Sequence, residues 1–452
     1  MFVNTLPLVN GWDRVRRYEE LERPSSLSER KEPGEVRVFV FGESSVAGSP
    51  WGPEMSSPAM LMDSLAGKVG RSKLTVVNMG VEASTTMDAY YYLISIRKYE
   101  PDFIIFYLGS NNRYDADLEM CLPANLPAVH AGWRFLVERS RLLAFLRIMG
   151  PVKLVQGAGW EERLRIFGKP RCDPEAGLQA WTDILVETAT GMGAAVVATS
   201  PALNVLFYFE NDNVYPTVDW THKRFYESLD PDYRTLLRCF LSPACDDDEG
   251  LRAALYSKER LEREGSPDTR ALGMGRAWAR SAARYGADYV DFRRILADIS
   301  RVGKPASPLI FDEVHLSLEG NWLLAEQWRA RIEGRISSSG SSTPPRTSPP
   351  DLSESYRRLS YPHERILLEQ GVDYLCRKNP LFAYPLLKQA ADRFGNKSAA
   401  LLIQWLRYMA GLRPGLSARE RARLDALDPA DYWTRAGRYP KHGELARGPK
   451  AD

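Results

Sequence analysis

The sequence predicts an α/β fold with a doubly wound parallel sheet of about five strands, followed by a small all-helical domain. Short runs of β-branched and aromatic residues recur before residue 300, and segments with helical spacing separate them. A Ser- and Pro-rich stretch then precedes a region rich in Leu, Ala and Tyr at helical spacing. Alternating strands and helices are typical of a parallel sheet whose ligands bind beyond the carboxyl ends of the strands.

The expected strands are short runs of β-branched and aromatic residues, and their alternation with helix-like stretches predicts parallel strands with crossover helices. Crossover helices are expected near 176–192 and 268–285, where apolar residues recur at helical spacing. The strand-like runs are 36–41, 74–78, 103–108, 194–200 and 288–293.

Five segments follow from composition. Residues 1–35 are expected to be an N-terminal arm, because 13–35 are dense in charge. An α/β domain follows over 36–335, with an insertion at about 202–266 that breaks the strand and helix rhythm. The other three segments are a flexible Ser/Pro-rich linker at 336–354, a helical domain of three or four helices at 355–435, and a tail at 436–452.

The charge balance excludes some partners. Sixty Lys and Arg against 58 Asp and Glu leave a formal charge of +2, too small to attract nucleic acid or an anionic membrane.

The five cysteines form no C-x-x-C pair, so we expect reduced thiols without a metal. The sequence has neither a signal-peptide pattern nor a run of roughly 18 apolar residues. A cytoplasmic location is expected, with a lost N-terminal anchor as the alternative.

Polar residues follow the expected strands at the points where a doubly wound sheet places its site. They occupy 42–45, 78–84, 109–112 and 312–315. Each cluster alone is weak evidence, because Gly, Ser and Asn are ordinary turn and cap residues. A Ser after the first strand, an Asn after the third and a D-x-x-H after the last would nevertheless meet in one crevice.

These clusters resemble the conserved blocks of the SGNH/GDSL hydrolases. GESS at 42–45 with Gly48, NMGVEAST at 78–85, YLGSNN at 107–112 and DEVHLSLEGNWLLA at 312–325 look like blocks one, two, three and five, in the right order. The resemblance spans roughly 36–333 and implies a three-layer, flavodoxin-like sheet. The chain further resembles those SGNH proteins that have a GESS-type loop and C-terminal helical repeats.

The resemblance implies a role for five residues. Ser44 aligns with the nucleophile, His315 with the general base that activates it, and Asp312 with the residue that orients the histidine. The backbone N–H groups of Ser44 and Ala83 and the side-chain amide of Asn111 would form the oxyanion hole. This chemistry requires neither a metal nor an organic cofactor.

Three departures from the family pattern leave details open. Glu43 and Ser45 replace the commoner Asp and Leu around the nucleophile, so Ser45 is a rival nucleophile. Ala83 replaces Gly, which is compatible with a backbone donor if the loop needs no positive φ. Asn112 replaces an Asp, and its amide can preserve the turn through neutral hydrogen bonds.

Three functions remain open at this level. The leading interpretation is an esterase acting on a small-molecule, sugar or lipid acyl ester. An acyltransferase would use the same residues and pass the acyl group to a hydroxyl or amine. A silent scaffold, whose helical domain binds a protein partner, is the alternative from a different class.

Other features have ordinary interpretations. The aromatic residues of the 202–266 insertion are a lid or simply core, and CDDDEG is a solvated acidic turn more readily than a calcium loop. His130, His222, His363 and His442 are expected to be surface or packing residues, with His222 retaining some chance of contacting substrate.

Overall fold

The computed structural model describes part of the chain, and every structural statement below concerns that part. It comprises 2–4, 27–49, 51–66, 73–82, 84–111, 123–140, 174–202, 234, 237–238, 241, 269–299, 309–310, 314–336, 343–346, 352, 363–376 and 380–427.

The described strands form a six-stranded sheet in which every pairing is parallel. Their order across the sheet is β1-β3-β2-β4-β5-β6. The five strands expected from the sequence are all present, which confirms the predicted doubly wound α/β class. The bounds are β1 Phe2–Asn4, β2 Val36–Gly42, β3 Leu74–Gly80, β4 Phe103–Tyr107, β5 Ala195–Thr199 and β6 Asp288–Val290.

Two strand predictions need correction. Residues 2–4, expected to belong to the N-terminal arm 1–35, form β1 and pair with the edge of β3 in the register Phe2↔Val76. A strand of three residues is too short for its alternation to stand out in the sequence. The last strand ends at Val290 instead of 293, because the fully buried Phe292 already begins the next helix.

Alternate residues of each strand point to opposite faces of the sheet, so the protein has two cores. Val38 and Val40 of β2 belong to one apolar cluster, whereas Phe39 and Phe41 belong to the other. All four side chains are completely buried. Each contributes roughly 2 kcal/mol through removal of apolar surface from water.

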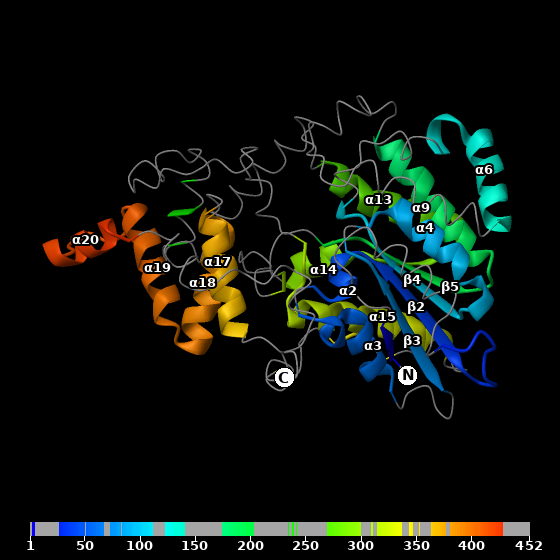
Figure 1. The fold of residues 1–452 in the computed structure, drawn as a ribbon, viewed down its shortest axis with the longest axis horizontal. Helices are drawn as coiled ribbons and strands as arrows, with labels where there is room; N and C mark the ends of the chain where they lie inside the picture. Colours follow the sequence, from blue (N-terminus) through cyan, green and yellow to red (C-terminus); the bar gives the residue numbers. More distant parts are fainter. Residues whose placement is uncertain are drawn as a thin grey trace.

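Helices cover both faces (Figure 1). One face carries α4 (Thr86–Ser95), α9 (Pro174–Thr190) and α13 (Thr269–Tyr285), with α6 (Pro127–Arg139) packed outside α9. The opposite face carries α3 (Ser57–Leu65), α14 (Phe292–Ile299) and α15 (Leu318–Ile336). The short elements are α2 Ser44–Ala47 and the 3₁₀ turns η1 Pro53–Met55 and η2 Arg97–Tyr99.

The strand order fixes where a ligand site should lie. Without β1, the order β3-β2-β4-β5-β6 is the flavodoxin-like arrangement, in which the chain direction across the sheet reverses between β2 and β4. A crevice opens at this switch point, beyond the carboxyl ends of the two strands. Ser44 follows β2, and Asn111 lies shortly after β4.

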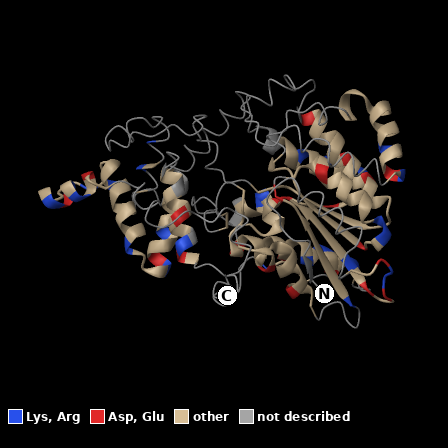
Figure 2. Ribbon diagram, viewed as in Figure 1, with Lys and Arg blue, Asp and Glu red and all other residues tan. Residues whose placement is uncertain are grey.

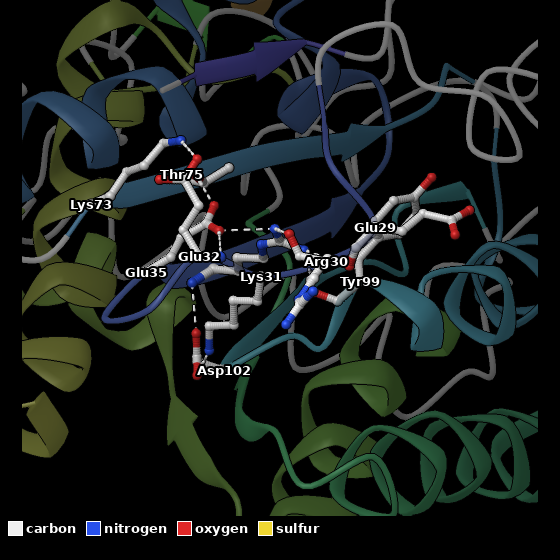
Figure 3. A network of polar contacts seen from close by, with 10 residues as sticks. Glu29, Arg30, Lys31, Glu32, Glu35, Lys73, Thr75, Tyr99 and Asp102 are labelled. Carbon is white, nitrogen blue, oxygen red and sulfur yellow. Dashed lines mark hydrogen bonds and ion pairs between the residues drawn. The ribbon is translucent and has the colours of Figure 1, made fainter.

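The opposite end of the sheet is closed by a buried ionic network (Figure 3). The guanidinium of Arg37 donates to Glu35 at 2.9 Å and to the Tyr99 carbonyl at 2.8 Å, and Glu35 also accepts from Thr75 at 2.7 Å. The hydrogen bonds from Arg37 and Thr75 hold the Glu35 pKa down to about 2, against the opposing effect of burial. Asp102 accepts the Arg37 backbone N–H at 2.7 Å and pairs with Lys31. The segment before β2 is thereby fixed to the sheet.

The expected helical domain is present and consists, in the described residues, of four helices. Helix α17 packs on α18, and α18 packs on α19. Asn396 caps α19, and a capping box of Ser417 and Glu420 begins α20. The bounds are α17 His363–Cys376, α18 Pro380–Phe394, α19 Lys397–Met409 and α20 Ala418–Asp425.

The helical domain shares an apolar core with the α/β domain. A single buried cluster extends from Trp51 and Leu316 in the α/β domain to Leu367 and Trp405 in the helices. Buried apolar contact of this kind couples two domains more firmly than a polar interface does.

Part of the expected linker at 336–354 is attached to the α/β domain. Ile336 is the last residue of α15, and Arg329 of this helix donates to the carbonyl oxygens of Thr343 and Pro344, at 3.4 and 3.1 Å. Glu326 accepts the backbone N–H of Arg346 at 3.3 Å. The linker is therefore fixed to α15 at 343–346, while 337–342, 347–351 and 353–354 lie outside the described residues.

Charges of both signs are interspersed over the described helices (Figure 2), in keeping with the near-neutral composition. Within the described ranges, no helix has the length and apolar character needed to cross a membrane. Most of the 202–266 insertion, the CDDDEG turn, His222 and His442 lie outside the described residues, so their predictions stay predictions.

Candidate active site

Ser44 and His315 meet at the carboxyl end of the sheet. The Ser44 Oγ lies 2.7 Å from the His315 Nε2, although 271 positions separate the two residues in sequence. Both residues are partly exposed, whereas their neighbours Glu43, Ser45, Val314 and Leu316 are buried. Buried residues therefore flank both members of the contact, while Ser44 and His315 themselves keep some exposed surface.

Ser44 occupies its position because α2 packs directly on the end of β3. A Cβ on Gly80 would lie 2.2 Å from the backbone nitrogen of Ala47, so only glycine allows this close approach. Asn78 strengthens the contact, since its amide donates to the Val46 carbonyl at 2.9 Å and its carbonyl oxygen accepts the Gly80 N–H at 2.9 Å. The turn that presents Ser44 is thus fixed to the end of β3.

Glu43, the residue before Ser44, connects the loops that follow β2 and β4. Its carboxylate is 4% exposed and accepts the backbone N–H of Gly109 at 2.8 Å and that of Asn111 at 3.1 Å. A buried carboxylate requires such donors, because its desolvation is otherwise costly. Glu43 therefore sets the position of Asn111 relative to Ser44.

Asn111 also reaches the loop after β3. Its side-chain amide donates to the Ser84 carbonyl at 3.0 Å. Ser84 in turn donates to the Val81 and Gly42 carbonyls, at 2.8 and 3.2 Å. Loops from three strand ends therefore converge around Ser44, as the sequence led us to expect. An Asn amide has two N–H bonds, so one remains to donate elsewhere.

The backbone around His315 is held on both sides. The hydroxyl of Ser45 donates to the Val314 carbonyl at 2.9 Å, and the indole N–H of Trp51 donates to the Leu316 carbonyl at 2.7 Å. The Ser317 N–H donates to the Leu309 carbonyl at 3.0 Å. These bonds, two of them from the segment that follows Ser44, fix the backbone that carries the imidazole.

Close packing also fixes the helix that follows His315. A Cβ on Gly320 would lie 2.0 Å from the carbonyl oxygen of Leu309, so α15 can approach this segment only with glycine there. Ser57 donates to the Asn321 side chain at 2.7 Å and joins α3 to α15. Helices α3 and α15 are therefore coupled close to the site.

The structure places some predicted site residues and leaves others untested. It brings Ser44 and His315 together and puts Asn111 beside the Ser84 loop. Asp312, Ala83 and Asn112 lie outside the described residues, so their predicted roles stay predictions. Ser45, the rival nucleophile, is buried and directs its hydroxyl to the Val314 carbonyl.

Sequence reasoning missed the contributions of Glu43 and Trp51. In the sequence Glu43 appears only as a departure from the commoner Asp, and its neighbours Gly42 and Ser44 do not reveal the two backbone N–H groups that its carboxylate accepts. Trp51 gave no signal, since nothing in its local sequence reveals a bond to a carbonyl 265 positions away. In the described ranges, no group of three or more His, Cys, Asp or Glu side chains could hold a metal ion.

A serine hydroxyl that lies within hydrogen-bond distance of a histidine can be activated as a nucleophile. A histidine within hydrogen-bond distance can accept the serine proton, and nearby N–H groups can stabilise negative charge on a substrate oxygen. Ser44 and His315 are both partly exposed.

Comparisons with known proteins give structural similarities only. No protein-family model and no curated protein sequence matches the chain. An α/β hydrolase enzyme from the metagenome of Lake Arreo, Spain, aligns at 14% identity with a TM-score of 0.37, over 67% of this chain and 97% of that one. The lipase/acylhydrolase from Enterococcus faecalis aligns at 14% identity with a TM-score of 0.35, over 66% and 96% of the two chains.

A GDSL-like lipase from Bacteroides thetaiotaomicron gives a comparable result. It aligns at 10% identity with a TM-score of 0.35, over 72% of this chain and 98% of that one. Because every one of these TM-scores is below 0.5, the similarities carry no conclusion about the activity of this chain.

Proposed function

We propose that this chain is a serine hydrolase of the SGNH/GDSL type that cleaves an acyl ester through an acyl-enzyme on Ser44. The observation that carries the proposal is the 2.7 Å contact between the Ser44 Oγ and the His315 Nε2 at the switch point of the sheet. A serine hydroxyl is a weak nucleophile unless an adjacent base accepts its proton.

The first half of the reaction acylates the enzyme. The Ser44 Oγ attacks the carbonyl carbon of the ester while the His315 Nε2 takes the hydroxyl proton. The tetrahedral intermediate then collapses, the carbon–oxygen bond to the alcohol breaks, and His315 returns the proton to the departing alcohol oxygen. Asp312 would orient the imidazole through its other nitrogen and stabilise its charged form.

The second half releases the acid. His315 accepts a proton from water as the water oxygen attacks the acyl-enzyme, and then returns that proton to the Ser44 Oγ as the ester bond breaks. The backbone N–H groups of Ser44 and Ala83 and the amide of Asn111 would bind the oxyanion in both halves. One well-placed donor of this kind contributes roughly 3 kcal/mol to lowering the barrier.

Glu43 supports this assignment of Asn111. The carboxylate fixes two consecutive parts of the loop after β4 through the Gly109 and Asn111 N–H groups. A donor contributes most when it is oriented before the reaction, because no reorganisation is then needed as charge develops. Glu43 is thus a positioning residue for the oxyanion hole.

Fluorophosphonate labelling with peptide mapping tests the proposal. Wild-type protein and the variants Ser44→Ala, Ser45→Ala and His315→Ala are purified, checked for folding by circular dichroism, and exposed to the same probe. We expect label on Ser44 in wild type and in Ser45→Ala, and none in Ser44→Ala or His315→Ala. Folded wild-type protein without label on Ser44 would contradict the proposal and favour a silent scaffold.

The same preparations can separate hydrolysis from transfer. An acyl-enzyme that reacts with water releases free acid, whereas an acyltransferase gives a new ester or amide with an added acceptor. We expect free acid to be the main product from p-nitrophenyl acetate in the presence of alcohol or amine acceptors. Transfer products in excess of acid would replace esterase by acyltransferase while leaving the Ser44 assignment intact.

A further inference from the structure

The helical domain contacts the α/β domain at Trp51 and at the first turn of α15, the helix that follows His315. His363, the first residue of α17, packs edge-on against Trp51, with ring centroids 5.1 Å apart and planes at 82°. Arg393 of α18 forms an ion pair with Glu319 in the first turn of α15, at 3.3 Å. Both contacts reach residues close to His315, because Trp51 donates to the Leu316 carbonyl and Glu319 lies in the first turn of α15.

Trp51 stands between the helical domain and that backbone. One side of its indole meets His363, while its N–H donates to the Leu316 carbonyl at 2.7 Å, next to His315. Trp51 is 6% exposed, so its ring has little space to move. Because protein interiors are close-packed and resist small displacements, a contact that fixes one edge of the Trp51 ring also fixes the opposite edge, which bonds to the Leu316 carbonyl.

His363 is built into the contact as a packing residue. It is 5% exposed and lies between Trp51 and Phe394, with the Phe394 ring centroid 5.3 Å away at an interplanar angle of 83°. Burial, together with the nearby charge of Arg393, lowers the His363 pKa to about 3. The ring is therefore neutral at physiological pH and packs as an aromatic group.

Building on the proposed function, we propose that the helical domain positions the catalytic histidine: His363 presses on Trp51, and Trp51 holds the backbone at Leu316 so that the His315 Nε2 stays within reach of Ser44. His363 and Trp51 are positioning residues in this arrangement. The helical domain is thus part of the active-site support.

The expected size of the effect follows from geometry. The Ser44 hydroxyl and the His315 ring are 2.7 Å apart, so a shift of one ångström in the His315 backbone would break the contact. Misplacement on that scale can lower a rate by on the order of a hundredfold. Loss of the His363 ring leaves the Trp51–Leu316 bond available but unsupported, so a smaller loss of tenfold or more is expected.

The chain contains a matched control for this test. His130 of α6 packs against Trp181 of α9 with the same centroid distance of 5.1 Å and the same angle of 82°, and it is also 5% exposed. His130→Ala therefore removes an equivalent His–Trp contact on the opposite face of the sheet. A purely structural role predicts equal consequences for His130→Ala and His363→Ala.

The experiment compares labelling rates in the full-length chain. Wild type, His363→Ala, His363→Phe, Trp51→Phe and His130→Ala are treated with a fluorophosphonate, and the rate at Ser44 is followed by mass spectrometry. We expect slower labelling in His363→Ala and Trp51→Phe, and wild-type rates in His130→Ala. His363→Phe, which keeps an aromatic ring against Trp51, should restore most of the rate. With p-nitrophenyl acetate, kcat should fall in His363→Ala while KM stays unchanged.

The outcomes separate the two proposals. Wild-type protein without label on Ser44 contradicts the proposed function itself. Label on wild-type Ser44, with His363→Ala and His130→Ala reacting at the same rate, overturns the positioning role and leaves the hydrolase in place. If His363→Ala does not fold, Trp51→Phe decides: slower labelling supports the role, and an unchanged rate overturns it.

Discussion

Two histidine–tryptophan pairs in this protein share one geometry and differ in what the tryptophan holds. His130–Trp181 and His363–Trp51 both have centroids 5.1 Å apart and planes at 82°. Trp181 packs against Tyr90 of α4 in the buried core on the opposite face of the sheet, whereas Trp51 donates to the carbonyl beside His315. The two tryptophans therefore fix different groups, and the group that Trp51 fixes is the backbone next to His315.

The largest expected effect comes from the residue that the second pair supports. His315→Ala should lower the rate of p-nitrophenyl acetate hydrolysis by roughly a thousandfold or more, because Ser44 loses its base. The measurement is kcat/KM at pH 7, with circular dichroism to verify folding. A loss smaller than that of His363→Ala would show that His315 is not the residue through which the His363–Trp51 pair acts.

A substitution at the far end of the sheet separates stability from activity. Glu35→Gln removes one partner of the buried Arg37 ion pair, in which both side chains are at most 3% exposed, and should cost about 3 kcal/mol of unfolding free energy. Urea denaturation measures this loss. Labelling of Ser44 in the remaining folded protein should proceed at the wild-type rate. A slower rate would mean that stability alone can explain the behaviour of His363→Ala.

Acid should affect both pairs in the same direction. Burial lowers the pKa of His130 to about 4 and that of His363 to about 3, from an unfolded value of 6.5. The unfolded chain therefore binds more protons, and stability that is present above pH 6.5 is lost as the pH falls toward these folded-state values. At pH 5 the loss should be about 2 kcal/mol for each histidine.

Phenylalanine substitutions check that assignment. His130→Phe and His363→Phe keep an aromatic ring and remove the titration, so each should flatten the dependence of unfolding free energy on pH by an equal amount. If neither variant changes the slope between pH 7 and pH 5, the two histidines are not the groups that respond to acid.

The smallest expected effect belongs to the exposed edge of the domain contact. Arg393 is 44% exposed in its ion pair with Glu319, and such surface pairs contribute only about 0.5 kcal/mol. Arg393→Gln should therefore leave the melting temperature and the labelling rate nearly unchanged. A large loss of labelling would show that the Arg393–Glu319 ion pair, and not Trp51, couples the helical domain to the site.

The sequence allowed the fold to be predicted where the pattern is local. Val36–Gly42 and Phe103–Tyr107 are runs of β-branched and aromatic residues, and buried parallel strands need little else. The strand at Phe2–Asn4 could not be predicted because three residues are too few to show an alternating pattern. Its place in the sheet also depends on pairing with the edge of β3, which is distant in sequence.

The candidate site divides in the same way. Ser44 and His315 were predicted because their motifs are short and local, and the structure brings them together. The bonds that position them join residues distant in sequence: Glu43 to Asn111, Ser45 to Val314 and Trp51 to Leu316. No local pattern reveals such contacts, since they exist only after the sheet has formed. The attachment of 343–346 to α15 could not be predicted for the same reason. The Ser/Pro-rich composition indicates a flexible segment and does not reveal that Arg329 binds the Pro344 carbonyl.

Trapping the acyl-enzyme tests the central claim most directly. Full-length protein is mixed with p-nitrophenyl acetate, quenched in acid within the first turnovers, and analysed by intact mass and peptide mapping. We expect one acetyl group on Ser44 in wild type, the same adduct formed more slowly in His363→Ala, and no adduct in His315→Ala. Acetyl on another residue, or hydrolysis that persists in Ser44→Ala, would contradict the account.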